Sequence, residues 1–282
     1  MPCHTQAKPT LTSCWAIGAF WPPEMNIRRR KWLRQLLCEL TANSLKQKHL
    51  CAFATFLYDH DWTIEPLFKK AIALNPNYAS AHHFYAVYLS ASGRHTEALA
   101  EIALARELDP LSLIISSING WLLYSARQYD DAINACQQVL DMDSNYVPAM
   151  LYMSHSYLNK GDYQQAISLL EKAKSAGATD SVMTSQFALA YAVAGKRQDA
   201  TRELAKLEKA SAQRYVSTLD LAAVYAALGD RDHAIHLLNN ALSDHDPWLV
   251  RLGIDPQFDR LRSDPRFAEL LSQVGYPKQD SK

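Results

Sequence analysis

A spacing of 34 residues constrains the fold of this chain more than any other feature of its sequence. Alanine recurs in the middle of five similar segments, at Ala98, Ala132, Ala166, Ala200 and Ala234. With Ile64 one period earlier, the pattern defines six units without insertions, which are 45–78, 79–112, 113–146, 147–180, 181–214 and 215–248. Self-similarity at such a period indicates a repeat architecture, in which each unit packs against its neighbours.

Each unit contains two runs of apolar residues with helical spacing. With the places of a unit numbered from 1 to 34, places 4, 7, 8 and 11 form one stripe and places 20, 24 and 27 form a second. Place 15 is glycine in four units, which favours a left-handed turn after the first helix. We therefore expect an antiparallel helix pair that has to stack on its neighbours to bury its apolar face.

Two further places keep the same register in all six units. Place 8 is always small, at Ala52, Ala86, Gly120, Ser154, Ala188 and Ala222. Place 24 is always apolar, at Phe68, Ile102, Cys136, Leu170, Leu204 and Leu238. Over residues 45–248 this pattern resembles the tetratricopeptide repeat (TPR) family. The resemblance implies an all-α fold, a right-handed α-solenoid of six helix pairs, and a scaffold for protein binding.

The two ends of the chain lie outside the repeat. In 249–277 the pairs Asp255-Pro256 and Asp264-Pro265 are helix-start signals. The second precedes an amphipathic pattern that we expect to cap the sixth unit, ahead of a tail at 278–282. Its apolar residues are Phe267, Leu270, Leu271 and Val274. The N-terminal segment 1–44 is expected to be mobile over 1–25, with a possible capping helix at 26–44.

Composition and charge exclude some classes of partner. Lys plus Arg equals Asp plus Glu, 29 of each, so nucleic acid is not expected as the main partner. The basic run RRRKWLR at 28–34 has two interpretations, a solvated chain end or a contact with phosphate or an acidic membrane surface. Five cysteines without a CxxC motif suggest free thiols and a cytoplasmic location. The apolar run 11–21 is about half a membrane span, so no span is expected.

The resemblance also implies where a partner binds. In this family, places 2, 5, 9, 12 and 13 of the first helices line the concave groove of the superhelix. Here these places give an aromatic and histidine-rich set in the first four units: Lys46, His49, Phe53, Phe56, His83, Val87, Ser117, Trp121, Tyr124, Leu151, His155 and Asn159. The last two units offer less distinctive residues there. The set suits a peptide with apolar anchors.

Individual groove residues have different expected roles. Trp121 and Tyr124 are expected to be exposed, because such anchors are enriched at binding surfaces. For Phe53 and Phe56 a second interpretation stays open, in which they pack between units. Family members that hold the C-terminal carboxylate of chaperones have Lys and Asn at places 5 and 9. The pairs here are His49/Phe53, His83/Val87, Ser117/Trp121 and Leu151/His155. No such carboxylate clamp is therefore expected.

Patterns for catalysis are absent from the sequence. It has no GxGxxG, Walker, HExxH or GxSxG motif. His82 is expected to be a packing residue, and His83 lies about 100° further round the helix, so the pair cannot hold one metal. Asp61 in DHDW is expected to cap a helix, and the pair His233 and His236 lacks a third ligand. We expect no enzyme activity, no metal and no cofactor.

A finer resemblance covers residues 59–270. The stretches YDHDW, FKKAIALNPNYASAHH and DPRF are similar to repeat regions of bacterial multidomain regulators, where the array accompanies a winged-helix, nucleotide cyclase or kinase domain. Two functions follow. The first is a non-enzymatic scaffold that binds a peptide or partner protein in the concave groove. The alternative is the sensor part of a bacterial transcriptional or signalling regulator, whose basic N-terminal run contacts nucleic acid.

Overall fold

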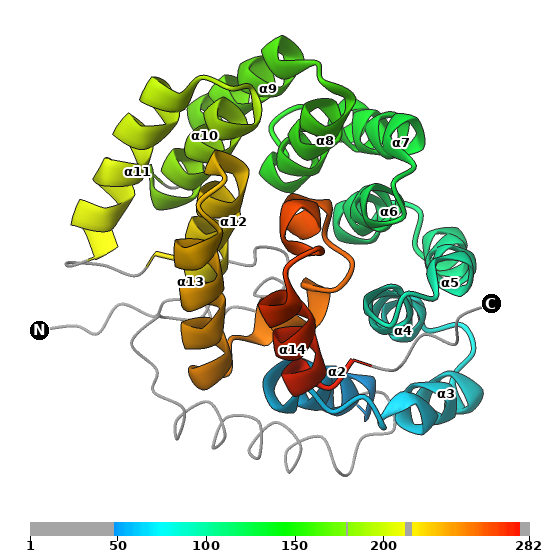
Figure 1. The fold of residues 1–282 in the computed structure, drawn as a ribbon. Coiled ribbons are helices and arrows are strands. Elements are labelled where there is room, and N and C mark those ends of the chain that lie inside the picture. Colours follow the sequence, from blue (N-terminus) through cyan, green and yellow to red (C-terminus); the bar gives the residue numbers. More distant parts are fainter. Residues whose placement is uncertain (1–47, 179, 212–215, 277–282) are drawn as a thin grey trace, which may run out of the picture.

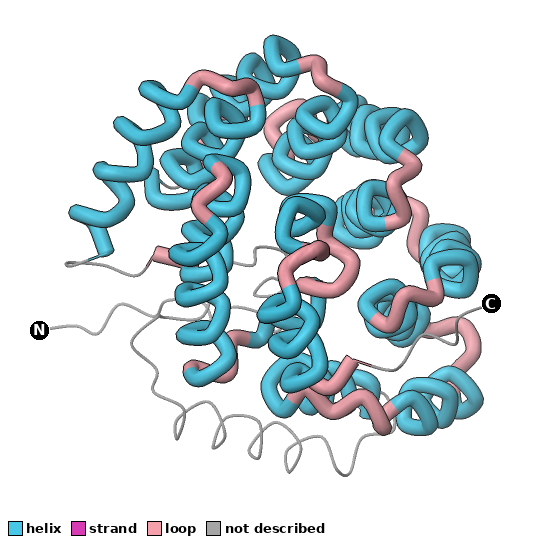
Figure 2. The backbone as a smooth tube through the Cα atoms, viewed as in Figure 1, coloured by secondary structure: helices cyan, strands magenta, loops and turns pink. Residues whose placement is uncertain are grey.

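The computed structural model describes residues 48–178, 180–211 and 216–276, and most of these residues are helical (Figure 1). Figure 2 shows helices joined by short loops, with no strand in the described residues. The predicted helix 26–44, the segment 1–25 and the tail 278–282 lie outside them. None of the described helices is long and apolar enough to cross a membrane. The all-helical solenoid predicted from the repeat is confirmed.

The described helices α2 to α13 form consecutive pairs that follow the 34-residue period. Their bounds are α2 Lys48–Asp59, α3 Glu65–Leu74, α4 Ala79–Ala91, α5 His95–Leu108, α6 Leu113–Ser125, α7 Tyr129–Met142, α8 Val147–Lys160, α9 Tyr163–Ser175, α10 Asp180–Val193, α11 Arg197–Ser211, α12 Thr218–Leu228 and α13 Arg231–Ser243. Helices α4, α6 and α8 begin at the first residue of a predicted unit.

The turn inside each pair uses a left-handed residue. Gly161 and Gly229 end α8 and α12 with φ angles of 81° and 85°. The third unit has Arg127 in this place, with φ of 62°, and the first unit uses His60, with φ of 51°. A side chain with a Cβ atom is disfavoured in this conformation, so these two turns are less favourable than the glycine turns.

The C-terminal segment, defined here as residues 247–276, contains three short helices. Each begins at the proline of an Asp-Pro pair. These are η2 Pro247–Arg251, η3 Pro256–Leu261 and α14 Pro265–Val274. The side chains of Asp246, Asp255 and Asp264 each accept a hydrogen bond from the second residue after them. An N-cap aspartate followed by a proline in the first turn explains why each helix begins where it does.

The solenoid curves until the end of its last unit reaches the turn of the first, where the rings of His60 and His245 stack, and the C-terminal segment fills the middle (Figure 1). The first helix of each pair (α2, α4, α6, α8, α10 and α12) faces inward, and the second helix faces outward. Helix α14 packs on the last pair through Phe267, Leu270 and Val274. In the other direction, Val250 and Ile254 join the apolar core of the first three units. The C-terminal segment therefore contacts both ends of the array.

Candidate functional site

The concave wall is lined by the first helices, as the resemblance implied, but in this structure it is mostly covered by the C-terminal segment. Among the predicted groove residues of the first unit, Lys46 lies outside the described residues, and the side chain of His49 is not described. Phe53 stacks on Phe84 with ring centroids 4.4 Å apart. Phe56 contacts Trp62 edge-to-face and has no exposed surface. Packing, the second interpretation of Phe53 and Phe56, is what the structure contains.

The predicted groove residues of the second unit are also buried. Val87 belongs to the same apolar cluster as Val250 and Ile254 of the C-terminal segment. His83 stacks on Phe84 at 4.8 Å between ring centroids and is 8 % exposed. Neither residue therefore presents a free surface to a second molecule in this conformation.

The expected exposure of Trp121 and Tyr124 is wrong. Trp121 is 8 % exposed, and Tyr124 has no exposed surface at all. The cause is the C-terminal segment, because the Tyr124 hydroxyl donates a hydrogen bond to Asp255 Oδ1 at 3.2 Å. Burial raises the pKa of Tyr124 well above its usual value, so this hydroxyl keeps its proton. Ser117 is buried too, and its hydroxyl donates to the Ile114 carbonyl at 2.9 Å.

Among the predicted groove residues whose side chains the structure describes, only one is exposed, and it belongs to the fourth unit. Leu151 is half-buried, and His155 is buried with Nε2 2.6 Å from Gln186 Oε1. Burial lowers the pKa of His155, so the neutral ring donates this hydrogen bond. Asn159 is exposed, and its amide donates to the His155 carbonyl at 2.9 Å.

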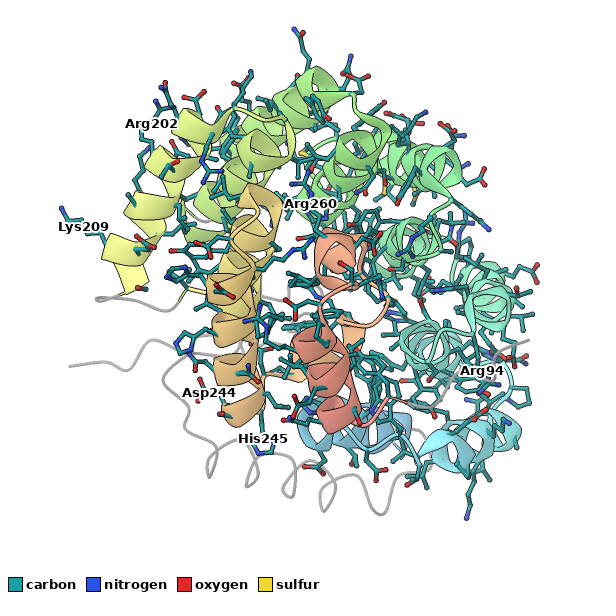
Figure 3. All side chains as sticks on the ribbon, viewed as in Figure 1. Arg94, Arg202, Lys209, Asp244, His245 and Arg260 are labelled. Atoms are coloured by element: carbon teal, nitrogen blue, oxygen red, sulfur yellow. The ribbon has the colours of Figure 1, made fainter. Side chains whose placement is uncertain are left out.

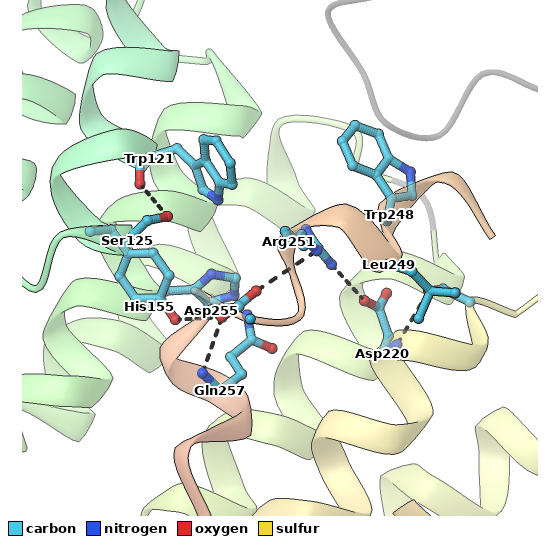
Figure 4. Close-up of polar contacts among 12 residues, drawn as sticks. Trp121, Ser125, His155, Asp220, Trp248, Leu249, Arg251, Asp255 and Gln257 are labelled. Carbon is cyan, nitrogen blue, oxygen red and sulfur yellow. Dashed lines mark hydrogen bonds and ion pairs between the residues drawn. The ribbon is translucent and has the colours of Figure 1, made fainter. Parts of the chain in front are cut away.

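A charged group of the C-terminal segment lies at the centre of the inner wall (Figure 4). The Arg251 guanidinium lies between Asp220 of α12, at 3.9 Å, and Asp255, at 3.7 Å. Both distances exceed that of a good charge-assisted hydrogen bond, and Arg251 Nε, the atom that faces Asp255, forms no hydrogen bond. Burial raises the pKa of Asp220, although Arg251 opposes the shift. Opposite charges therefore face each other in this contact, but at distances too long for strong hydrogen bonds.

A cavity of about 250 Å³ remains between the C-terminal segment and the wall. Helices α6, α8, α10 and α12 form its wall, and η3 forms its other side. The lining residues are Tyr124, His155, Leu158, Asn159, Leu189, Val193, Ala227, Pro256, Gln257, Asp259 and Arg260. Three predicted groove residues, Tyr124, His155 and Asn159, are thus brought together there.

Arg260 is the cationic side chain of this cavity. Figure 3 places it on the inner side of α12, whereas Arg202 and Lys209 of α11 point outward. Its Nη1 donates to the Ala227 carbonyl, and no described carboxylate forms an ion pair with it. Sequence reasoning missed this residue because η3 lies outside the repeat. The signal available in the sequence was the start motif Asp255-Pro256, which placed a helix there.

The two ends of the array are joined by His60 and Trp62, the neighbours of Asp61 in the sequence DHDW. His60 Nε2 lies 3.0 Å from the Asp246 carbonyl, and Trp62 Nε1 donates to the Val274 carbonyl at 3.0 Å. Trp62 also contacts the ring of Tyr276 at 4.7 Å between centroids. These contacts hold the first turn of the array against the C-terminal segment and close the ring.

The remaining candidates have structural partners. His82 bridges Glu101 Oε2, at 2.6 Å, and the Pro76 carbonyl, at 2.8 Å. Asp61 accepts hydrogen bonds from Thr63, and α3 itself begins at Glu65 without a side-chain cap, so the predicted capping role is wrong in detail. His233 pairs with Asp230 at 2.8 Å. Within the described residues no three His, Cys, Asp or Glu side chains are placed to bind one metal.

Comparison with known proteins gives the same fold. Residues 123–184 match the family model described as tetratricopeptide repeat. No curated protein sequence matches the chain. The APC/C hetero-tetramer structure Cut9-Hcn1 has a TM-score of 0.59 and 15 % identity, over 88 % of this chain and 49 % of that one.

Two shorter solved proteins are similar over almost their full length. A tetratricopeptide repeat protein from Parabacteroides merdae has a TM-score of 0.51 and 14 % identity, over 86 % of this chain and 98 % of that one. A thermophilic TPR protein in Thermus thermophilus has a TM-score of 0.50 and 19 % identity, over 69 % and 99 %. At these identities the likeness concerns the fold alone. The chain therefore contains a stretch that matches the tetratricopeptide repeat model, over residues 123–184, and its stacked helix pairs have the fold of the tetratricopeptide repeat proteins named above.

Proposed function

We propose that this chain is a non-enzymatic scaffold whose peptide or protein partner binds the inner wall of the ring at the cavity beside η3. The family supports the coarser part of this proposal, since its helix pairs form general binding surfaces. The observation that favours this site is the open cavity of about 250 Å³, lined by the predicted groove residues Tyr124, His155 and Asn159.

The cavity suits an apolar side chain next to a polar or acidic group. Its apolar walls are formed by Leu158, Leu189 and Val193. Such walls favour burial of an apolar side chain of the partner. Asn159 and Arg260 are exposed at its edge, where they can bind a backbone carbonyl or a carboxylate of the partner. Pockets with apolar walls and a few polar groups are typical binding sites.

The rest of the predicted groove is accessible only if the C-terminal segment moves. Val87 and Trp121 belong to the same apolar cluster as Val250 and Ile254 of this segment, so a long partner would have to replace its contacts. The loose ion pairs of Arg251 make part of that interface weak. A short partner segment can use the cavity without this cost.

Site-specific photo-crosslinking tests the proposal. A photoreactive amino acid at Asn159, which is exposed at the cavity, should link to a partner in cells, and peptide mapping should return one sequence. The same group at Gln137, exposed on the outer helix α7, serves as the control. Equal products from both positions would argue against a site at the cavity.

Filling the cavity gives a second test. Val193→Trp should reduce the Asn159 crosslink at least tenfold, because the indole occupies the space that the partner needs. Leu104→Trp adds the same ring to an outer position that is 45 % exposed and should leave the crosslink unchanged. Circular dichroism would show that both variants stay helical. An unaltered crosslink in Val193→Trp would reject the cavity as the site.

A further inference from the structure

A row of exposed apolar residues follows one edge of the first three units. Leu74, Leu108 and Met142 are the last residues of α3, α5 and α7 and are 45 %, 38 % and 48 % exposed. They are 34 residues apart, so they occupy place 30 of consecutive units. Leu111, in the loop after α5, is 79 % exposed at the same edge. We call these four residues the edge row.

The edge row is confined to one part of the ring. In the later units, place 30 is Ala176, Ala210 and Asp244, which offer little or no apolar surface. A repeated apolar position on three neighbouring units, absent from the next three, is not needed for the repeat itself. Contiguous exposed apolar residues of this kind mark contact surfaces.

The chain outside the described residues begins at this same edge. In an antiparallel helix pair the first helix starts where the second one ends, so Lys48, the first residue of α2, lies near the edge of Leu74. Residues 45–47 span at most about 10 Å. A segment ending at residue 44 can therefore reach the edge row.

The sequence of 26–44 matches the edge row in shape and charge. In a helix, Trp32, Leu33, Leu36, Leu37 and Leu40 share one side. Nineteen residues of helix extend about 28 Å, enough to cross three helices packed about 8–10 Å apart. The basic run 28–34 would meet Glu107, Asp109 and Asp141, which are exposed beside the row.

Ring closure removes the place where an N-terminal cap would otherwise pack. The terminal face of the first unit is occupied by the C-terminal segment, because α2 packs against η2 and Trp62 against Tyr276. We propose that residues 26–44 of this chain dock as an amphipathic helix on the edge row, within the same molecule. Their apolar side would cover Leu74, Leu108, Leu111 and Met142.

Trypsin tests this in the full chain, because the run 28–34 contains its cleavage sites. We expect this run to be cut slowly in the native chain, and at least tenfold faster in the variant Leu108→Glu, Met142→Glu. The matched control is Ala176→Glu, Ala210→Glu, at the same place of later units, which should be cut at the native rate. Equal cleavage of all three proteins would overturn the proposal.

A disulfide test distinguishes the occupants of the row. In a chain with Cys3, Cys14, Cys38 and Cys51 replaced by serine, Leu37→Cys should link under mild oxidation to Leu108→Cys within one molecule. Pairing Leu37→Cys with Ala210→Cys should give at least tenfold slower linkage. Linkage only between two molecules would assign the row to a second copy of the chain. Equal linkage rates for positions 108 and 210 would mean that a different partner covers the row. Either result rejects docking within the chain.

Discussion

The inner and outer helices of this ring differ in how much of their surface is buried. On the inner helix α4, every residue from Ala81 to Ala91 is buried. On its outer partner α5, only Ala98, Ile102 and Ala105 are buried. An outer helix touches the array along one stripe, as expected for a surface helix. The inner helix is covered on all sides because the C-terminal segment occupies the concave wall, so most of the wall is core.

The largest difference in stability between inner and outer variants should come from truncating a buried aromatic side chain. Phe56→Ala on α2 should lower the free energy of unfolding by about 3–5 kcal/mol, since Phe56 is fully buried against Trp62 and Tyr88. Leu104→Ala on the outer surface, at a side chain that is 45 % exposed, should cost less than about 1 kcal/mol. Urea denaturation measures both values.

This comparison also has a clear failing outcome. If Phe56→Ala costs no more than Leu104→Ala, Phe56 is not part of a closed core and the concave wall is open in solution. A lower m-value for Phe56→Ala would instead indicate that the inner side of the native chain has loosened.

The fold followed from the sequence because the repeat fixes each helix pair locally. Place 15 glycines, small residues at place 8 and apolar stripes each depend on contacts inside one unit or with the next unit. The position of the C-terminal segment was not predictable in this way. It depends on the total curvature of six units, which brings Trp62 to Val274 across 212 residues. No local pattern specifies such a contact.

A carboxylate that joins inner and outer helices should make stability depend on pH. Burial opposes ionisation of Glu65, but hydrogen bonds from Lys69, Tyr85 and Arg94 lower its pKa from 4.5 to about 2. A lowered pKa stabilises the folded state above the unfolded pKa, and this stability is lost as pH falls from about 4.5 towards 2.

The corresponding variant is Glu65→Gln. It should lose about 2–3 kcal/mol at pH 7, and the difference from the native chain should disappear near pH 2. Unfolding by urea across this pH range measures the effect. Glu97→Gln, whose carboxylate is 55 % exposed, is the control and should change little. A constant difference at all pH values would show that the Glu65 charge is not involved.

A smaller loss of stability is expected at the contact between the inner wall and the C-terminal segment. Tyr124→Phe removes the hydrogen bond to the buried Asp255, which should cost about 1–2 kcal/mol. Tyr163→Phe changes an outer tyrosine that is 37 % exposed and should have no measurable effect. Hydrogen exchange should also increase in η3 for Tyr124→Phe alone. Exchange that rises equally in α9 would contradict a local role.

The site was predicted less well than the fold for a related reason. The resemblance placed the candidate residues on the first helices of the units, but it assumed that the wall they form was free. One sequence feature did indicate a covered wall. The first helices of the second and third units have apolar residues on all sides, as in HHFYAVYLSA and LIISSINGWLLY. A helix of that kind is buried all round. Arg260 and Arg251 could not be found from the repeat, since they belong to the C-terminal segment.

The smallest effect should come from a turn that contacts the C-terminal segment. Arg127 has a left-handed backbone where four other units have glycine, and its guanidinium pairs with Asp259 at 2.7 Å. Arg127→Ala and Arg127→Gly both remove this exposed pair, which is worth little. Only glycine relieves the backbone, so it should be more stable than the alanine variant by about 1 kcal/mol. Thermal unfolding should separate the two by about 2–4 °C. Equal unfolding temperatures would mean that the left-handed backbone costs no free energy in the alanine variant. The loops between helices would then be less conformationally restricted than the inner wall.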